Sequence, residues 1–438
     1  MEDLIGDELS KSCLIFPFSK INANAISALV ASLDIHPILQ DLDILFPPFH
    51  DDPLFIVDSI KPYTKIILAY SLFSTQLDLV SKKIDEYRSM IVNKDLLVIA
   101  GGPHPMGDPF SMLSNGTDIV CVTEGEVVIR DILLRFIEGK KVEEALGIAY
   151  LNEQGNLERT KKPELINLDD FPPFSYKHRL IRPIEITRGC AWNCRFCQIR
   201  SRGIPVRHRS IEVILRYVKL TVDHFYKRRP DIRFISPNAL SYGSLDGRKL
   251  QLDQVEKLLS GIKQIIGEEG KIYFGSFPSE VRPETITLES VAILKKYTNV
   301  EKIIVGGQSG SNSILNFSER GHTVQETERA VKLLIDNGFN VDVDIIFGLP
   351  GETDDDVKQT LIHIKYLTDI GATIHSHTFL PLVGTPFASK PGGKINPLYL
   401  PVINNLQNSH RLSGFHNKQE KEAEIMAKRR EQEKELKR

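Results

Sequence analysis

Residues 186–203 have the sequence ITRGCAWNCRFCQIRSRG and hold three of the five cysteines of the chain, at Cys190, Cys194 and Cys197. Cys13 and Cys121 lie far away, so no fourth cysteine is near the Cys-x3-Cys-x2-Cys pattern. Thiolates are soft ligands that suit zinc or iron–sulfur clusters. A structural zinc site needs four ligands, with His208 as a candidate for the fourth, whereas three thiolates on a four-iron cluster leave one iron open. The pattern favours the open cluster over zinc.

The bulk composition is that of a globular protein of two or three domains, with 438 residues, 41% hydrophobic and 26% charged. A net charge of −2 indicates neither nucleic-acid nor membrane binding. The N-terminus does not resemble a signal peptide, and we find no apolar run long enough to span a bilayer. Five cysteines, three of them clustered, do not make a disulfide framework. We therefore expect a cytoplasmic protein.

The first 146 residues alternate short apolar runs with helical patterns such as 21–34 and 127–139. The strand candidates are 13–18, 64–71, 95–102 and 117–126. Such alternation predicts a doubly wound, Rossmann-like α/β domain with a parallel sheet, whose ligands bind at the carboxyl ends of the strands. The polar residues at those ends are equally compatible with ordinary strand-to-helix turns.

Residues 147–180 are expected to form a hairpin and a linker, and a second alternation fills residues 181–395. Its strand candidates are 184–189, 232–237, 271–278, 301–309, 340–348 and 374–382. Six strand–helix units predict a partial (β/α)6 barrel with its site at the carboxyl ends of the strands. The C-terminal extension, 396–438, ends in a mixed-charge run that predicts a solvated helix or disorder.

The cysteine stretch follows the first strand of this second domain, and Phe196 can shield a cluster from water. Thr187-Arg188-Gly189-Cys190 through Cys197 resembles the signature of the radical S-adenosylmethionine (radical SAM) superfamily. The resemblance implies that the three cysteines hold a [4Fe-4S] cluster and that SAM chelates its open iron. It further implies cleavage of SAM to methionine and a 5′-deoxyadenosyl radical, with electrons from a donor such as a flavodoxin or ferredoxin.

The same resemblance assigns SAM contacts to the later strand ends, although the usual Gly-Gly-Glu after the second strand is absent and Asp344 replaces the first glycine of the fifth-strand motif. The candidates are Phe196, Ser236, Asn238, Glu280, Gln308, Ser309, Ile346 and Gly348. Physically, a glycine lets the backbone approach adenine and Ile346 can pack on its face. Glu280 with Arg282 is equally compatible with a surface salt bridge.

The first domain resembles the cobalamin-binding domain of one radical SAM subgroup. The residues that carry this resemblance are Ser71, Ser74, Gly101, Gly102, Pro103, Glu124 and Gly125. The loop after the first strand, PFSKINANAIS, lacks the Asp-x-His-x-x-Gly motif that supplies a lower cobalt ligand in many such domains. The alternative is a relic domain without a cofactor.

The favoured function is therefore a radical SAM enzyme that uses cobalamin to methylate or rearrange an unactivated carbon of a substrate that the sequence does not name. One alternative is a methylthiotransferase acting on tRNA or protein, which would need three further cysteines in the first domain. Another is a non-catalytic iron–sulfur or cobalamin sensor. No catalytic residue beyond the cofactor ligands is predicted.

Overall fold

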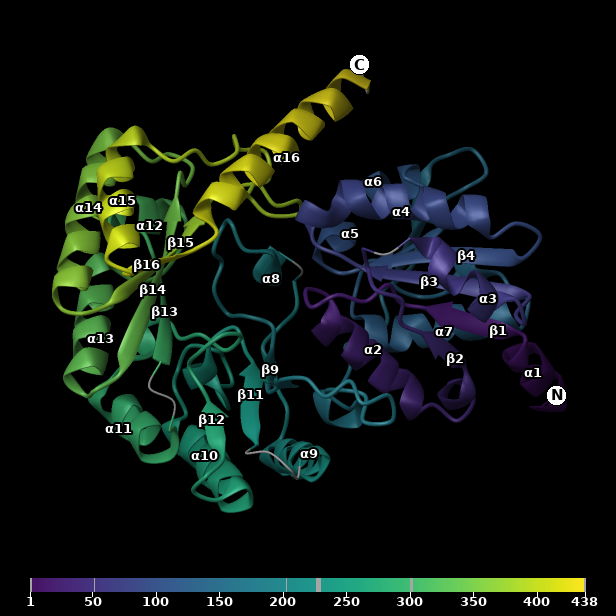
Figure 1. Cartoon of the computed structure of the whole chain (residues 1–438), viewed down its shortest axis with the longest axis horizontal. Coiled ribbons are helices and arrows are strands. Elements are labelled where there is room, and N and C mark those ends of the chain that lie inside the picture. Colours follow the sequence, from purple (N-terminus) through teal and green to yellow (C-terminus); the bar gives the residue numbers. More distant parts are fainter. Residues whose placement is uncertain (1, 51, 202, 226–229, 300–301, 437–438) are drawn as a thin grey trace. The chain divides into compact units, whose positions relative to one another are not determined.

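The computed structural model describes residues 2–436 except residues 51, 202, 226–229 and 300–301. The chain divides into two compact units, Met1–Arg182 and Pro183–Arg438. Both alternate strands with helices along the sequence (Figure 1). Within the described residues, no helix is both long enough and apolar enough to cross a membrane.

The first unit is built on a seven-stranded sheet in the order β2-β1-β3-β4-β5-β6-β7. Its strands are β1 (Ser12–Ile15), β2 (Asp43–Leu45), β3 (Lys65–Ser71), β4 (Asp95–Gly101), β5 (Ile119–Cys121), β6 (Ile148–Leu151) and β7 (Leu157–Arg159). The first five pair in parallel. This parallel arrangement confirms the predicted doubly wound α/β class.

Helices cover both faces of this sheet, because successive side chains of a strand point to opposite faces. Leu14 and Ile67 pack against α2 (Ala23–Asp34) and α7 (Gly125–Ile137). Cys13 and Ile66 face the opposite side. That side is covered by α3 (Val57–Ile60), α4 (Leu77–Met90) and α6 (Pro109–Ser114). The two short helices α1 (Glu2–Ser10) and α5 (Pro103–Gly107) complete the unit. Strands buried on both faces explain the continuous apolar runs in the sequence.

The hairpin that the sequence assigns to the linker belongs to the first sheet. β6 pairs antiparallel with β5 through Val120 and Ala149, and β7 continues the sheet from β6. Without the hairpin, the backbone groups on this edge of β5 would be unpaired, and β6 supplies their hydrogen-bond partners. The first unit therefore extends past residue 159 to Arg182.

The second unit carries the expected six parallel strands in sequence order, which confirms the partial barrel. These strands are β8 (Ile184–Glu185), β11 (Asp231–Ile235), β12 (Lys271–Tyr273), β13 (Lys302–Gln308), β14 (Asn340–Phe347) and β15 (Thr373–Thr378). They form a three-stranded and a four-stranded sheet. A parallel bridge between Val281 and Val305 joins the two. The fourth strand of the second sheet, β16 (Leu412–Gly414), pairs in parallel with β15 and was not predicted.

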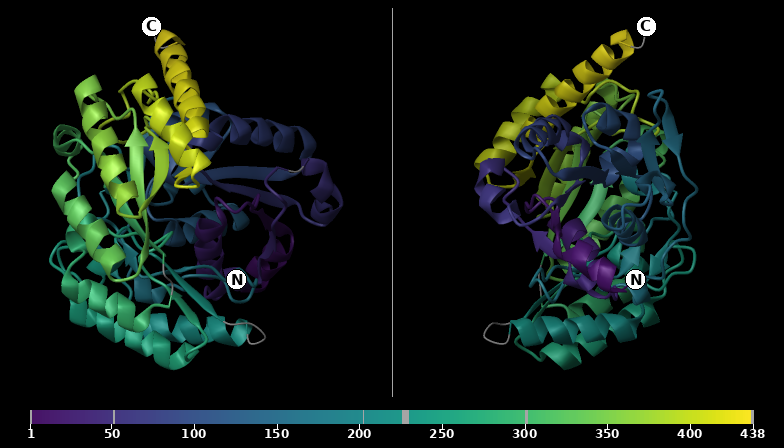
Figure 2. Two further views of the ribbon diagram at one scale, coloured as in Figure 1. Left: turned by 60° about the vertical axis from the view of Figure 1, so that its left-hand side comes forward. Right: turned by 90° about the vertical axis from the view of Figure 1, so that its right-hand side faces the viewer.

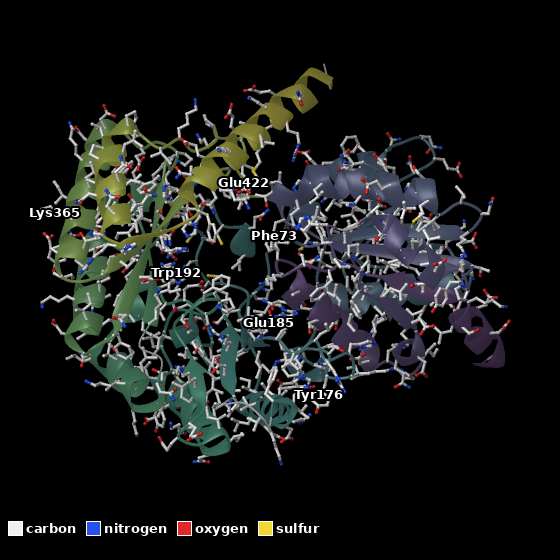
Figure 3. The ribbon with its side chains drawn as sticks, viewed as in Figure 1. Phe73, Tyr176, Glu185, Trp192, Lys365 and Glu422 are labelled. Atoms are coloured by element: carbon white, nitrogen blue, oxygen red, sulfur yellow. The ribbon has the colours of Figure 1, made fainter. Side chains whose placement is uncertain are left out.

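Amphipathic helices line one side of these strands (Figure 2). They are α9 (Ile211–His224), α10 (Leu252–Ile266), α11 (Leu288–Tyr297), α13 (Val324–Asp336) and α14 (Asp354–Asp369). In α10 the buried positions Val255, Leu258, Leu259 and Ile262 recur at helical spacing. Lys365 on α14 points outward from the unit (Figure 3).

The C-terminal extension is structured. It contains α15 (Leu400–Asn408), β16 and α16 (His416–Leu436). The charged tail thus forms a helix, one of the two predicted states. Thr378 Oγ1 donates to the carbonyl of His416, so the start of α16 is attached to the end of β15.

Candidate functional site

The cysteine loop leaves the barrel directly after its first strand. β9 (Thr187–Arg188) pairs antiparallel with β10 (Arg207–His208), and the loop between them ends in α8 (Gln198–Ser201). Gly189 has a φ of +84°, and a Cβ there would lie 2.2 Å from the carbonyl oxygen of Pro205. Only glycine permits this approach, which brings the two ends of the loop together.

Backbone hydrogen bonds hold the cysteine loop against two distant segments of the unit. The Arg195 N–H donates to Ser318 O at 3.1 Å, and the Phe387 N–H donates to Arg195 O at 3.1 Å. Gln198 Nε2 donates to Val383 O at 2.9 Å. The Arg195 guanidinium also lies over the rings of Phe317 and Phe387. The loop conformation is therefore fixed by the barrel rather than by its own sequence.

Two buried guanidinium groups converge on Cys194. Nη1 of Arg320 lies 3.3 Å from the sulfur and Nη1 of Arg282 lies 3.9 Å from it. Burial alone would raise the pKa of the Cys194 thiol, but the two arginines outweigh it and the net shift is downward. Burial raises the pKa of Cys190 and of Cys197. The two arginines therefore favour the thiolate form of Cys194, and a bound metal centre would favour deprotonation of all three cysteines.

The arginine cluster was largely missed at the sequence level. The sequence offers Arg282 only as a surface salt-bridge partner of Glu280, whereas its side chain is buried and pairs with Glu284. Its guanidinium stacks 3.9 Å from the centre of the Trp192 ring, inside the cysteine loop, where Figure 3 labels Trp192. Arg320 follows α12 (Asn312–Phe317) in a stretch without a recognisable motif, so only the fold reveals it.

The zinc alternative does not fit this geometry. His208 has both ring nitrogens engaged, Nδ1 with Thr187 Oγ1 at 2.9 Å and Nε2 with Ser244 O at 2.9 Å, so it is no fourth ligand. Sulfurs that share one zinc ion lie about 3.8 Å apart. Among the described residues, the three cysteine sulfurs form no group whose atoms all lie within 4.8 Å of one another. The donor set fits a larger thiolate-bound cluster.

Phe196 and Ile346, two of the predicted SAM contacts, lie in one apolar cluster. They pack against the buried side chains Ile314, Leu349, Phe379 and Phe387. Phe196 comes from the cysteine loop and Ile346 from β14, so this cluster joins the loop to the fifth strand. Its apolar character keeps water from the side of the loop that it covers.

A close backbone contact explains the glycine that follows β14. Gly348 has a φ of +68°, and a Cβ would lie 2.6 Å from the backbone of Lys394. The glycine thus admits the chain at residues 393–394, and its contact with adenine stays a prediction. Its N–H donates to Glu352, which also accepts from the Tyr399 hydroxyl at 3.0 Å. Gly348 and Glu352 line a pocket of about 710 Å³ together with Phe317, Lys394 and Glu420.

The end of the second barrel strand is a buried polar turn. Ser236 Oγ donates to Asn238 O at 3.0 Å, and Asn238 Oδ1 accepts from the Arg282 N–H at 3.3 Å. Asn238 Nδ2 is buried and has no hydrogen-bond partner among the residues that the structure describes. Glu280 is half-buried, and burial raises the pKa of its carboxyl group. Asn238 is thus tied to the arginine that contacts Cys194, and its amide retains a donor for a ligand.

The two candidates after β13 differ in their surroundings. Gln308 is half-buried with a φ of +74°. Ser309 is buried, its Oγ accepting from the Ser311 N–H at 3.2 Å and lying 3.5 Å from Thr360 Oγ1 on α14. The hydroxyl of Ser309 therefore holds the turn against the helix.

In the first unit, the predicted cobalamin contacts gather at the carboxyl ends of β3, β4 and β5. Gly102 has a φ of +98°, and a Cβ would lie 3.1 Å from the Leu72 backbone and 3.2 Å from Ser71 Oγ. Pro103 opens α5 and Gly125 opens α7, directly after this edge. Small residues leave the end of β4 without bulky side chains, as a docked cofactor would require.

Several polar groups at this edge already have internal partners. His104 contacts Ser74 Oγ through Nδ1 and Ser111 Oγ through Nε2, both at 3.0 Å, so neither nitrogen is free for cobalt. Glu124 accepts from the Ile166 N–H at 3.2 Å. Ser74 and Glu124 therefore have structural roles.

Residues 184–364 match the family model described as the radical SAM superfamily, and these residues contain the cysteine loop and five of the six barrel strands. The second unit therefore contains a radical SAM region.

Its curated relatives are similar over part of their length. It is 32% identical over 209 residues to a tRNA-2-methylthio-N(6)-dimethylallyladenosine synthase of Anaplasma phagocytophilum, covering 47% of this chain and 44% of that protein. It is 25% identical over 289 residues to an uncharacterized methyltransferase of Pyrococcus horikoshii, covering 63% and 59%. The chain thus spans about half the length of these relatives.

Among solved structures, the fold is similar to TsrM of Kitasatospora setae, a radical SAM methyltransferase with cobalamin and a [4Fe-4S] cluster bound. The TM-score is 0.66 at 14% identity, over 87% of this chain and 74% of that one. The cobalamin-dependent radical SAM enzyme OxsB gives 0.64 at 20% identity, over 83% and 53%. At these identities the likeness shows the fold of both units.

We predict that Arg320→Met lowers the midpoint potential of the reconstituted cluster by on the order of tens of millivolts, because it removes a cation that favours the reduced, more negative state. A redox titration followed by electron paramagnetic resonance (EPR) would measure the shift. Arg320→Lys keeps the charge and should shift the potential less. Equal midpoint potentials in Arg320→Met and the unchanged protein would contradict a cluster bound next to Arg320 through Cys194.

Glu352 gives a prediction for stability. Burial raises its pKa from the ordinary value of 4.5 to about 7. A raised folded-state pKa contributes stability that is present below the unfolded pKa and is lost as pH rises through the folded one. The free energy of unfolding, relative to Glu352→Gln, should therefore fall by up to roughly 3 kcal/mol between about pH 4 and about pH 8. Urea denaturation would measure it, and a difference independent of pH would refute it.

Proposed function

We propose that this chain is an enzyme that reductively cleaves SAM at a [4Fe-4S] cluster held by Cys190, Cys194 and Cys197. The observation that carries the proposal is the cysteine loop itself. Three thiolate ligands follow the first strand of a radical SAM barrel, with Arg282 and Arg320 donating to one of them. When bound, the cluster supplies the electron that converts SAM to methionine and a 5′-deoxyadenosyl radical.

The protein's own residues would bind SAM and exclude water. The buried Nδ2 of Asn238 has no partner within the described part of the chain, which supports a role in donating to the polar methionine end of SAM. Phe196 and Ile346 belong to an apolar cluster beside the loop. Ser236, Glu280 and Gln308 stand at neighbouring strand ends and remain proposed contacts. Ser309 and Gly348 support the turns, and their contacts with SAM also remain proposed.

We further propose that the first unit binds cobalamin. Small residues at the carboxyl edge of its sheet support this proposal, above all Ser71, Gly101 and Gly102, with the helix start at Gly125. His104 is engaged on both nitrogens, and the loop after β1 has no histidine. The cobalt would therefore have no histidine ligand from either segment. Cobalamin would supply a methyl-carrying or electron-transferring centre for methylation or rearrangement at an unactivated carbon.

Methylthiotransferase activity, suggested by the sequence relatives, is less well supported. The expected second cluster needs three thiolates in the first unit, which has only Cys13 and Cys121. These two lie on strands β1 and β5 and face opposite sides of the sheet. They could not ligate one cluster without rebuilding the unit.

A reducing electron donor such as a flavodoxin or ferredoxin would be the protein partner, in a cytoplasmic setting that keeps the thiols reduced. The carbon substrate remains to be identified.

The first test is SAM cleavage after anaerobic reconstitution with iron, sulfide and dithionite, with 5′-deoxyadenosine measured by mass spectrometry. Cys194→Ala should abolish cluster absorbance and cleavage, because it removes the thiolate that both arginines stabilise. Cys121→Ala is the matched control and should retain both. Retained cleavage in Cys194→Ala would refute the cluster assignment, and a non-catalytic sensor would release no 5′-deoxyadenosine in any variant.

The second test concerns cobalamin alone. Protein produced with hydroxocobalamin available should keep its corrin absorption bands through gel filtration, because the ligand would be held by the edge of the first sheet. Absorption spectra before and after washing measure retention. Complete loss of the bands would overturn the cobalamin proposal and leave the cluster proposal untouched.

A further inference from the structure

Asp344, His375 and His377 form a cluster on the two neighbouring strands β14 and β15 (Figure 1). The parallel register pairs Asp344 with His375 and Ile346 with His377. All four residues therefore share the half-buried face of the sheet, while Ile345, Phe347 and Ile374 fill the buried face. The three residues are far in sequence from the cysteine loop at 190–197.

Its three ligand atoms lie as close together as atoms that bind one metal ion. Asp344 Oδ1 is 2.9 Å from His375 Nδ1 and 3.7 Å from His377 Nε2, and the two ring nitrogens are 3.1 Å apart. Ligand atoms about 2.1 Å from a shared ion lie roughly 3.0 Å apart in an octahedral site and 3.4 Å apart in a tetrahedral one. The observed triangle has edges of that size.

Hydrogen bonds to neighbouring groups orient the side chains of this Asp–His–His cluster. The Thr378 N–H donates to Gln419 Oε1 at 2.9 Å, which turns Gln419 Nε2 toward His377 Nδ1 at 3.3 Å. An amide nitrogen can only donate, so neutral His377 then carries its proton on Nε2. Both ring N–H groups can then be directed at the Asp344 carboxylate, which interacts with His375 and with His377.

A cation between the three atoms would replace the two shared protons and meet a lone pair from each ligand. The surrounding charge favours it as well. Glu280 adds a second carboxyl group close enough to be influenced by Asp344 and both imidazoles. The nearby Lys302 forms an ion pair with Asp342, with 2.6 Å between Nζ and Oδ2. Between 17% and 26% of each side chain of the cluster is exposed, which leaves access for an ion.

We propose that Asp344, His375 and His377 bind a divalent transition-metal ion, of the class of Zn²⁺ or Fe²⁺, at a site separate from the cysteine loop. Two imidazoles and one carboxylate suit these borderline ions better than Mg²⁺ or Ca²⁺, which prefer oxygen ligands. Three protein ligands leave further positions for an exogenous donor. On the face shared with Ile346, that donor would be a nitrogen or oxygen atom of the substrate.

Metal binding by His377 requires the Gln419 side chain to change its hydrogen bonds. Metal-bound His377 carries its remaining proton on Nδ1, and that proton needs an acceptor. The Gln419 amide must then turn its oxygen to His377 and give up the Thr378 hydrogen bond. A carboxylate at position 419 accepts from both groups, so Gln419→Glu should bind the ion about tenfold more tightly.

The test uses the whole chain with its [4Fe-4S] cluster reconstituted. The protein is dialysed against Zn²⁺ and its zinc content is measured by mass spectrometry. We expect about one zinc per chain, with X-ray absorption showing only nitrogen and oxygen neighbours. His375→Ala and the nearly isosteric Asp344→Asn should each lower zinc affinity by at least tenfold. His410→Asn, at an exposed histidine, is the control for adventitious binding and should change nothing.

Three results would overturn the site. They are zinc content unaffected by the Asp344 and His375 variants, sulfur neighbours around the zinc, and weaker binding in Gln419→Glu. Zinc binding does not require SAM cleavage, so failure of this site and failure of the proposed radical SAM activity are separate outcomes. Circular dichroism of each variant would show that lost zinc does not reflect lost folding.

Discussion

A thiolate in the protein interior needs a compensating charge, and the arrangement of the second unit around Cys194 meets this need. Arg320 comes from the segment after α12 and Arg282 from the segment after β12, and both are buried against the same sulfur. A buried cation is itself unstable without partners. Arg282 therefore pairs with Glu284 and stacks on Trp192, while Arg320 donates to the carbonyl of Gly306. The cysteine loop, the third strand and the fourth strand are linked through one charge.

The loop can sit among these groups only because its backbone is held from outside. Gly189 lets the loop close against Pro205, and Arg195 hydrogen-bonds to the segments at Ser318 and Phe387. Phe196 then extends into the apolar cluster with Ile346. Charge balance on one side and apolar packing on the other give a dry and electropositive environment for a cluster. Both features are suited to holding a reducible metal centre.

Sequence patterns predicted the features that depend on local spacing. The three cysteines and the parallel strands are each encoded within a few residues, and the structure contains both. The charged C-terminal run left a helix and disorder open, and the structure has the helix. Features that depend on pairing between distant segments were missed. Arg320 is unremarkable until the fold brings it to Cys194, and the hairpin at 148–159 joins the first sheet through an edge that no local pattern marks. The close approach of the Lys394 backbone to Gly348 is likewise visible only in the fold.

The group formed by Asp344, His375 and His377 depends both on local spacing and on pairing between distant segments. His375 and His377 are two residues apart on a predicted strand, so the sequence alone places them on one face. Asp344 joins them only through the register of β14 with β15, which pairs it with His375. The fifth-strand motif of the family has a glycine where Asp344 stands, and a glycine would leave two histidines without a carboxylate. The departure from the family pattern and the two histidines therefore belong to one feature, a polar face that the register of β14 with β15 assembles.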